Sequence, residues 1–367
     1  MANRYRHVAY VLSLTAIGAC TDCPSTLGLG VGGTAAAFGC GPATPYTDAE
    51  TPIAWDSGQQ PSGPSPLKLA FLGDQGIGAD AQAVLELVLD EGAEALIQLG
   101  DFAYLDGSPR AWDAQLSKVL GEDFPVFAVV GNHDTARWSG TSGFQALLQA
   151  RLERVPGARC QGDYGVNASC TFRGAVSFVL SGVGTLGSGH EAYLDAALSR
   201  RSTPFRLCLW HKNQHDMQVG SKTDEVGWEA YRICARHGVP IITAHEHSYA
   251  RTFTLDAVGD TERAHGVVGA PDTLELMPGR TAVAVAGLGG QSRRSLTPDH
   301  SADSWWASIY AGDCQLRNGV VQDTAPSILY GALFLEIGID GDPYAAHGYF
   351  KTTDGEVHDD FTVHLTE

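Results

Sequence analysis

The sequence predicts an α/β fold, and three observations support this prediction. From residue 67 onward, apolar runs of strand length alternate with longer segments that have helical spacing. The apolar runs contain few polar residues, which is typical of strands buried on both faces in a parallel sheet. Several of the runs end directly in Asp, Asn or His. Side chains of these types at strand ends favour a functional site along one edge of a sheet.

The first 20 residues predict an export signal. They have a basic start and an apolar stretch that is too short to span a bilayer. Small residues precede Cys20 in "IGAC", which resembles a bacterial lipoprotein cleavage site, so an N-terminal lipid at Cys20 would attach the protein to a membrane. The alternatives are an uncleaved anchor and a start codon placed too early. We expect an exported protein, which is periplasmic, extracellular or a cell-surface lipoprotein.

Residues 21–66 predict a low-complexity, proline-rich tether. The stretch 41–66 contains six prolines and has no periodicity, which is the composition of a surface linker. A single folded domain is therefore expected over residues 67–367.

The elements of this domain follow from the spacing of its apolar residues. The strands expected in the first part are 67–74, 95–101, 124–134, 175–182, 205–211 and 240–247, and the helices between them are 79–92, 109–121, 190–201 and 225–239. After residue 280, strands follow one another without helices at 281–290, 330–340, 345–357 and 359–365. This change predicts an antiparallel section that completes a second sheet.

The charge and the cysteines limit the function classes. A formal net charge of −18 with no basic run argues against nucleic-acid binding, because that needs basic patches. A phosphate substrate would therefore need local positive charge, such as metal ions. Eight cysteines in an exported chain permit disulfides, and Cys160–Cys170 is the favoured pair. Cys208 and Cys234 lie in apolar segments, where buried free thiols are the alternative, and Cys314 has no evident partner.

Five apolar runs end in groups that can bind metals. These groups are Asp74, Asp101, the triplet Asn132, His133 and Asp134, then His211, and finally His245 and His247. The carboxyl ends of strands in an α/β sheet share one edge, so we expect these side chains to converge. Asp, Asn and His without thiolates favour Fe, Mn or Zn. The groups are too many for one ion, and two ions bridged by a carboxylate would suit displacement at phosphorus.

The five motifs "GDQG", "GDFAY", "GNHD", "CLWH" and "AHEHSYAR" resemble, in order, those of calcineurin-like metallophosphoesterases. Tyr104 in "GDFAY" and the ending "HEHSYAR" are most similar to the purple acid phosphatase branch. The resemblance implies a four-layer α/β/β/α sandwich and a binuclear metal-dependent hydrolase of phosphate esters, with a metal-bound hydroxide as nucleophile. The implied enzyme is a phosphomonoesterase that resembles purple acid phosphatases and acts on a small-molecule phosphoester.

The resemblance also implies a role for each motif residue. The first metal ion would be held by Asp74, Tyr104 and His247, the second by Asn132, His211 and His245, and Asp101 would bridge the two. His133 would be the catalytic residue, contacting the phosphate or protonating the leaving oxygen. His215, Lys212 and Arg251 are the candidate substrate-binding residues, although an exposed loop for the first two and a structural salt bridge for Arg251 are the alternatives. Glu246 is expected to face away from the metal ions.

Tyr104 decides the expected metal identity. A phenolate ligand favours Fe(III), paired with Fe, Zn or Mn, whereas a tyrosine that only packs beside the site would leave two divalent ions. The second case corresponds to a phosphodiesterase or nucleotidase. A non-catalytic surface lipoprotein that binds a partner is a further alternative, which an intact ligand set disfavours. The sequence leaves the oligomeric state open.

Overall fold

A computed structural model describes residues 66–104, 107–200, 202–312, 314–322 and 329–366. The predicted export signal, the cysteine at position 20 and nearly all of the predicted tether lie outside these residues. In the part of the chain that the structure describes, no helix is both long and apolar enough to cross a membrane.

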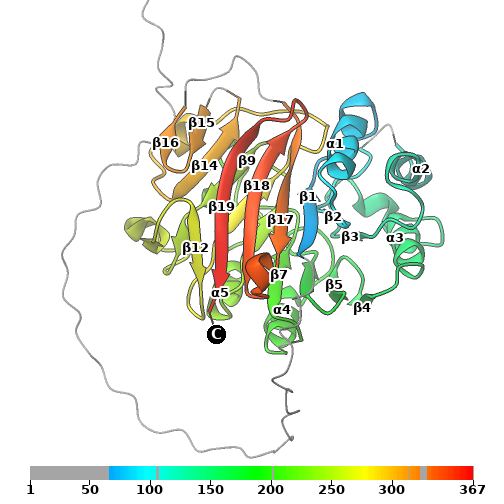
Figure 1. Ribbon diagram of the computed structural model, residues 1–367, viewed down its shortest axis with the longest axis horizontal. Helices are drawn as coiled ribbons and strands as arrows, with labels where there is room; N and C mark the ends of the chain where they lie inside the picture. Colours follow the sequence, from blue (N-terminus) through cyan, green and yellow to red (C-terminus); the bar gives the residue numbers. More distant parts are fainter. Residues whose placement is uncertain (1–65, 105–106, 201, 313, 323–328, 367) are drawn as a thin grey trace, which may run out of the picture.

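The first sheet has seven strands and carries the first three motifs. In the order β12-β19-β18-β17-β1-β2-β3, its strands are Thr273–Leu276, Val357–Leu365, Ala345–Thr352, Gly331–Ile337, Leu67–Leu72, Ala95–Gln98 and Val126–Ala128. Strands β1, β2 and β3 are parallel. The helices α1 (Ala79–Asp90), α2 (Pro109–Leu120) and α3 (Phe144–Leu152) lie beside these three strands (Figure 1).

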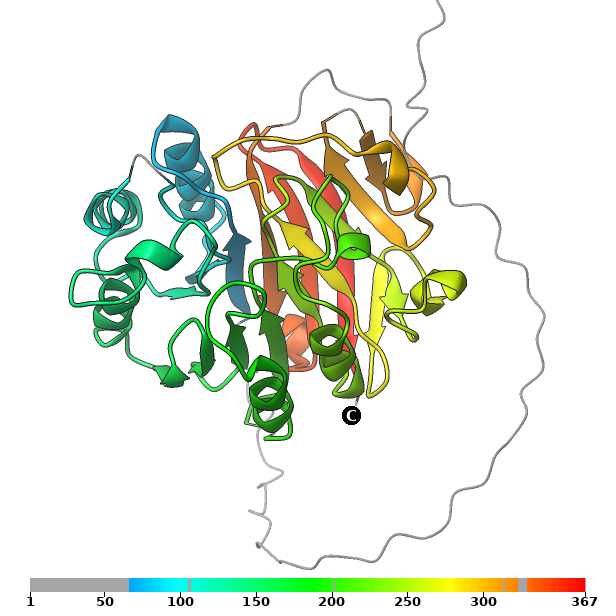
Figure 2. The same cartoon turned by 180° about the vertical axis from the view of Figure 1, so that it is seen from behind.

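The second sheet has ten strands and carries the last two motifs. In the order β16-β15-β14-β9-β13-β8-β7-β6-β5-β4, its strands are Val320–Val321, Cys314–Arg317, Trp306–Ala311, Tyr249–Thr252, Val283–Ala286, Ile241–Thr243, Phe205–Leu209, Val176–Ser181, Asn167–Phe172 and Ala158–Asp163. Strands β6, β7, β8 and β13 are parallel. The helices α4 (His190–Leu198) and α5 (Glu229–Arg236) cover its outer face (Figure 2).

Short elements complete the described chain. Strands β10 and β11 (Thr254–Leu255 and Val267–Val268) form a separate pair, and the 3-10 helices are Thr135–Arg137, His215–Met217, Thr261–Gly266, Pro298–His300 and Ile339–Gly341.

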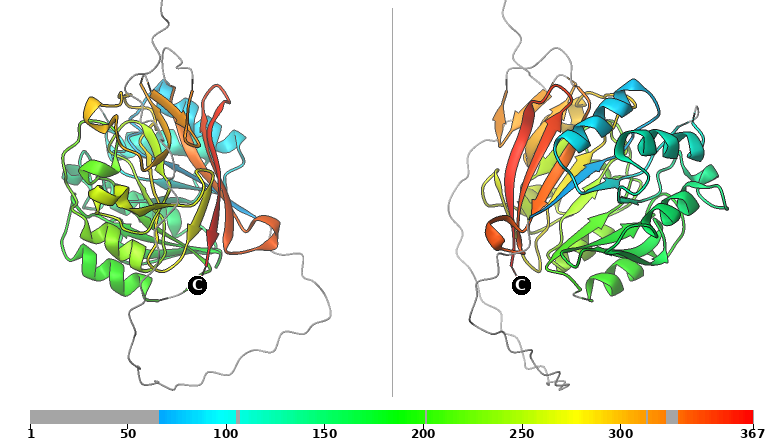
Figure 3. Two further views of the ribbon diagram at one scale, coloured as in Figure 1. Left: turned by 90° about the vertical axis from the view of Figure 1, so that its left-hand side faces the viewer. Right: turned by 45° about the vertical axis from the view of Figure 1, so that its right-hand side comes forward.

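Two clusters of buried side chains hold the layers together. One lies between the two sheets and beneath α1, α2 and α3, and the other lies between the second sheet and α4 and α5. Strand β7 contributes to both, because Leu207 and Leu209 face the first cluster while Cys208 faces the second. This explains why Leu207, Cys208 and Leu209 are all apolar. Figure 3 shows the sheets packed face to face, with α4 and α5 on the side away from β18 and β19. The α/β class and the layered sandwich are thus confirmed.

The last strands differ from the expectation. They were expected to complete a second sheet. The strand expected at 281–290 is β13 of the second sheet, but β17, β18 and β19 extend the first sheet, with β17 antiparallel to β1. Strands β14, β15 and β16 instead extend the second sheet. A local sequence pattern indicates a strand but not its partner, because pairing depends on residues far apart in the chain.

The disulfides agree in part with the sequence. Cys160 and Cys170 are joined, as expected, across the antiparallel pair β4 and β5. Cys208 and Cys234 also form a disulfide, which links β7 to α5, so the free-thiol alternative is wrong for this pair. Cys314, for which the sequence suggested no partner, is disulfide-bonded as well.

Candidate metal centre

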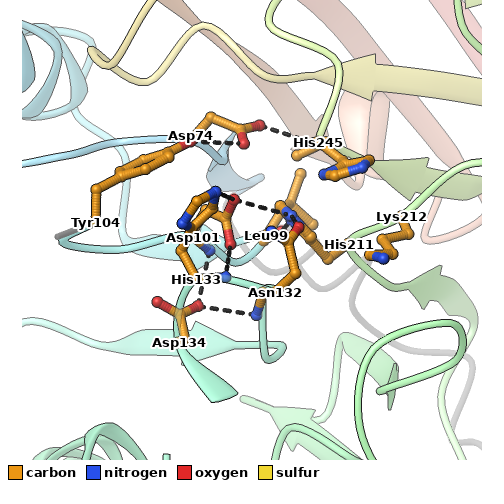
Figure 4. Close-up of polar contacts among 12 residues, drawn as sticks. Asp74, Leu99, Asp101, Tyr104, Asn132, His133, Asp134, His211, Lys212 and His245 are labelled. Atoms are coloured by element: carbon orange, nitrogen blue, oxygen red, sulfur yellow. Dashed lines mark hydrogen bonds and ion pairs between the residues drawn. The ribbon is translucent and has the colours of Figure 1, made fainter. Parts of the chain in front are cut away.

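The predicted ligands follow the ends of five strands and lie together where the edges of the two sheets meet. Asp74 follows β1, Asp101 follows β2, and Asn132 follows β3. From the second sheet, His211 follows β7 and the segment with His245 and His247 follows β8. Figure 4 shows side chains of both sheets pointing toward one another around Asp101.

The backbone at this centre is strained. Asp74, Asp101, Tyr104 and His245 have φ values of 56°, 56°, 49° and 68°, which is the left-handed region that non-glycine residues seldom adopt. Each such residue costs about 1–3 kcal/mol and persists only where the surrounding structure holds it. Four candidate ligands with this conformation indicate that tight turns after the strands aim these side chains into the centre.

Gly131 allows the loops of β2 and β3 to approach each other. A Cβ atom at position 131 would lie 2.1 Å from the backbone nitrogen of Asp101 and 2.3 Å from its Oδ1. Only glycine leaves room for this approach, which accounts for the glycine in "GNHD" in terms of contact rather than chain flexibility.

The first group of candidate ligands consists of Asp74, Tyr104 and His247. Oδ1 of Asp74 lies 3.0 Å from the Tyr104 hydroxyl, and Nε2 of His247 lies 3.2 Å from each of them. Ligands bound at about 2.0–2.2 Å to one ion are separated by about 3–3.5 Å. The three atoms therefore have the spacing of a coordination shell.

The second group consists of Asn132, His211 and His245. Nε2 of His211 lies 3.1 Å from Oδ1 of Asn132 and 3.3 Å from Oδ2 of Asp101. Ligand atoms of Asp101, His211 and His245 all lie within 4.8 Å of one another. The second group, together with Asp101, can therefore also surround one ion.

Hydrogen bonds fix the carboxylates of this centre. Oδ1 of Asp101 accepts the backbone N–H of His133 at 2.8 Å, which leaves Oδ2 facing His211. Asp134 accepts the backbone N–H groups of Gly131, Asp101 and Phe102 at 2.8 to 2.9 Å. Asp134 thus ties the two loops together.

Each of the three histidines uses one ring nitrogen for a partner outside the centre. His211 Nδ1 lies 2.7 Å from the carbonyl oxygen of Leu99, and His247 Nδ1 lies 2.5 Å from Oγ of Ser292. His245 Nε2 lies 2.6 Å from Oε2 of Glu225. A carbonyl or carboxylate oxygen only accepts, so these contacts fix the tautomers of His211 and His245 and leave their other nitrogen for a metal ion. The Ser292 hydroxyl can accept from Nδ1 of His247 in the same way, which leaves Nε2 of that ring for an ion.

The pKa values of Tyr104 and Asp74 in the first group favour a bound cation. Burial raises the pKa of Tyr104 far above its usual range, and Asp74 adds to the effect. Burial alone would also raise the pKa of Asp74, but His247 and the other histidines outweigh it and hold that pKa below its usual range. Tyr104 therefore ionises only if a bound cation offsets the negative charge around it.

The histidines of the second group differ in charge. Burial, together with the nearby His211, lowers the pKa of His245 to about 2, so this ring is neutral. Burial would lower the pKa of His211 as well, but the adjacent Asp101 raises it to about 9. Metal binding at His211 would displace this proton, because a ligand histidine must be neutral.

The segment with the two histidines is a bend, not part of a strand. Strand β8 ends at Thr243 and β9 begins at Tyr249, so strand alternation does not explain why His245 and His247 reach the same site. Glu246 does point away from the two groups, as expected, and its Oε2 pairs with Arg294 at 3.1 Å. The bend, rather than the strand expected over 240–247, therefore places both histidines at the centre.

The expected substrate residues have different surroundings. His133 lies at the rim, with its ring 4.6 Å from that of Tyr104 and its side chain 42% exposed. The ammonium group of Lys212 pairs with Glu225. His215 contacts Gln218, Asp299 and His300 rather than a candidate ligand.

The expectation that Arg251 binds substrate is corrected by the structure. Its side chain is 1% exposed and makes two hydrogen bonds to the buried Asp359, at 2.6 and 2.9 Å. The guanidinium also donates to the carbonyl oxygen of Pro271. Arg251 therefore forms a structural salt bridge, which was the alternative.

A second group with ligand-type side chains, His215, Asp299 and His300, is less suited to a metal ion. Their ligand atoms also lie within 4.8 Å of one another. However, both ring nitrogens of His300 have partners, Asp303 at 2.7 Å and Gln218 at 3.2 Å. No nitrogen of this buried ring is left for an ion, so we assign no site here.

Several residues that shape the centre carried no sequence signal. Glu225 and Ser292 lie in loops without a recognisable motif, and their roles depend on contacts with His245 and His247. Asp134 lies within "GNHD", so the motif could have identified it as the residue that joins two loops.

The comparisons with known proteins agree with this geometry. The model of the calcineurin-like phosphoesterase family matches residues 67–249, which include all the candidate ligands. No curated protein matches the sequence.

Two solved structures show a similar fold. Purple acid phosphatase PPD1 from yellow lupin (Lupinus luteus) seeds is 16% identical, with a TM-score of 0.56 over 82% of this chain and 54% of that chain. This chain thus spans about half of the length of the lupin protein. GAP50, the anchor in the inner membrane complex of Plasmodium, is 13% identical, with a TM-score of 0.50 over 83% of this chain and 90% of that chain. At such identities the likeness shows the fold alone. With the match of the family model and the arrangement of the five motifs, the chain belongs to the calcineurin-like phosphoesterase family.

Proposed function

We propose that this protein hydrolyses phosphate monoesters with two metal ions, as purple acid phosphatases do. The observation that carries the proposal is the pair of ligand groups, with Asp101 beside the second group and separations of 3.0 to 3.3 Å between neighbouring ligand atoms. The donors are oxygens and imidazole nitrogens, which fit Fe, Zn or Mn.

Three residues of the site would have separate roles in the reaction. The two bound ions would supply Lewis-acid activation of the phosphoryl oxygens and of a water molecule. Asp101 would be a ligand of both ions, and Asp134 keeps the loop of Asp101 in place. His133, exposed at the rim, is placed to donate a proton to the leaving oxygen, for which a histidine has a suitable pKa range.

Metal content and substrate preference test this proposal together. The purified protein should contain about two metal ions per chain, and it should hydrolyse an aryl phosphate monoester faster than the matching diester. The activity should disappear after chelation and return when metal is added. Hydrolysis by a metal-free preparation would overturn the proposal. Faster turnover of the diester would favour the phosphodiesterase alternative.

The metal identity is tested at Tyr104. If its phenolate binds Fe(III), the oxidised protein should be coloured, and Tyr104→Phe should remove the visible absorption band while the protein stays folded. The physical reason is that the Tyr104 hydroxyl lies 3.0 Å from Asp74 in the first ligand group. Absorption spectra and metal analysis of the two proteins provide the measurement.

Tyr193→Phe is the matched control for this prediction. The Tyr193 hydroxyl bonds to the carbonyl oxygen of Gln161, which belongs to β4, so its loss should leave the colour unchanged. A colourless native enzyme that holds two divalent ions would rule out iron–phenolate ligation.

A binding role is the second candidate. GAP50, which has a similar fold, is described as an anchor in a membrane complex, so this fold also occurs in a protein that is not described as an enzyme. The presence of bound metal ions with no turnover of either ester class would support this candidate for the present protein.

A further inference from the structure

Among the three candidate ligand histidines, His245 has the most strongly charged outer partner. Nδ1 of His211 meets the carbonyl oxygen of Leu99, and Nδ1 of His247 meets a serine hydroxyl. Nε2 of His245 instead meets the carboxylate of Glu225 at 2.6 Å. Hydrogen bonds to a charged acceptor are shorter and about twice as strong as neutral ones.

We propose that Glu225 is a positioning residue of the metal centre, which holds His245 with its proton on Nε2 and so presents Nδ1 to the ion shared with Asp101 and His211. The proposal rests on the proposed function, because it assumes that the two ligand groups hold ions. Glu225 itself binds no metal and touches no reacting atom.

The tautomer follows from the chemistry of the contact. A carboxylate can only accept hydrogen bonds, so Nε2 of His245 must carry the hydrogen and Nδ1 must carry the lone pair. Carboxylate partners of this kind orient ligand histidines and make them stronger donors to a metal ion.

Two direct contacts, one of which continues to the segment of His245, keep Glu225 in place. Oε1 of Glu225 pairs with the ammonium group of Lys212. The backbone N–H of Glu225 donates to the carbonyl oxygen of Asn213 at 3.2 Å. Asn213 in turn donates from Nδ2 to the carbonyl oxygen of Ala244 at 2.5 Å. The loop that carries Glu225 is thus tied to the residue before His245, so the carboxylate and the ring are held together.

This arrangement also explains why Lys212 is not free for substrate. Its ammonium group, with a side chain only 16% exposed, compensates the charge of Glu225. Lys212 therefore supports the second ligand group through Glu225 rather than meeting the phosphate directly.

The test is the affinity of each metal ion in variants of position 225. Zn²⁺ is added to the apo protein, and its two dissociation constants are measured by competition with a chelator. Glu225→Gln and Glu225→Ala should lower the affinity for one of the two Zn²⁺ ions by about 10- to 100-fold, with the larger loss for alanine. The other ion, held by Asp74, Tyr104 and His247, should keep its affinity.

Asp195→Asn is the matched control. Oδ1 of Asp195 lies 2.9 Å from Nε2 of His237 on the outer surface formed by α4 and α5, so this change removes a similar carboxylate–histidine contact away from the metal centre. Both zinc affinities should remain as in the wild type. The thermal unfolding of each apo variant, followed by circular dichroism, separates a loss of metal affinity from a loss of fold.

Two outcomes overturn the proposal, and they can be distinguished. If the wild type binds two Zn²⁺ ions and folded Glu225→Ala binds both with unchanged affinity, the role of Glu225 is refuted while the proposed function stands. If the wild type binds no pair of ions, the proposed function and this inference fail together.

Discussion

Asp101→Asn is expected to abolish hydrolysis and to prevent the binding of two metal ions at once. On the proposed function, Asp101 would be a ligand of both ions, and its Oδ2 lies 3.3 Å from Nε2 of His211. Without its negative charge, two cations at close range would repel each other with less compensation. The loss of turnover should exceed the roughly 100-fold effect of removing an outer partner of a ligand. Steady-state hydrolysis and metal analysis of the same preparation provide the measurement.

The control for this prediction is Asp123→Asn. Asp123 forms an exposed pair with Arg154, and the side chain of Asp123 is 76% exposed. The activity and the metal content of the Asp123→Asn protein should therefore equal those of the wild type. The asparagine at position 101 can still accept the backbone N–H of His133, so the fold should persist. An Asp101→Asn protein that holds two ions and keeps most of its turnover would contradict the bridging role.

Arg251→Ala should lower the free energy of unfolding by about 3–5 kcal/mol, because it leaves a buried carboxylate without its ionic partner. Arg251 on β9 of the second sheet and Asp359 on β19 of the first are 1% and 0% exposed, so their pair joins the two sheets. Tyr249 and Ser308 also donate to Asp359, at 2.6 and 2.7 Å. Urea unfolding followed by circular dichroism would show the lower midpoint.

The pH dependence of this stability has a definite sign. Burial alone would raise the pKa of Asp359, but Arg251 outweighs it and holds the pKa below its usual range. A carboxyl group of this kind stabilises the fold above its ordinary pKa, and the contribution is lost as the pH falls through the lowered value. The wild type should therefore lose part of its stability in acid, and Arg251→Ala should lose less over the same range.

Two further variants make the Arg251 prediction specific. Arg154→Ala removes an exposed ion pair and should change stability by less than about 1 kcal/mol. Replacing Arg251 with methionine and Asp359 with leucine together should destabilise less than Arg251→Ala alone, because no unpaired charge remains buried. A double variant as unstable as the single one would show that packing, rather than charge, carries the effect.

The sequence by itself predicted much of the candidate site because the important residues are local to strand ends. Each motif places a carboxylate, amide or imidazole directly after an apolar run, so recognising the strand also locates the side chain. Asp74 and Asp101 illustrate this, since each follows its strand by two or three residues. The structure brings both motif groups together at ligand spacing. The α/β class follows from the same apolar runs, which are buried on two faces.

The tertiary structure alone decided features that depend on contacts between distant segments. The strand β17 could not be assigned to β1 from local periodicity, and the disulfide between Cys208 and Cys234 depends on how α5 packs on β7. The sequence left Arg251 open between phosphate binding and a structural salt bridge, and only its contact with Asp359, 108 residues away, decides for the salt bridge. Glu225 had no signal at all, because its role arises from one contact with His245. Residue type and strand position determine which groups reach the site, whereas long-range packing determines their partners and therefore their charge, tautomer and role.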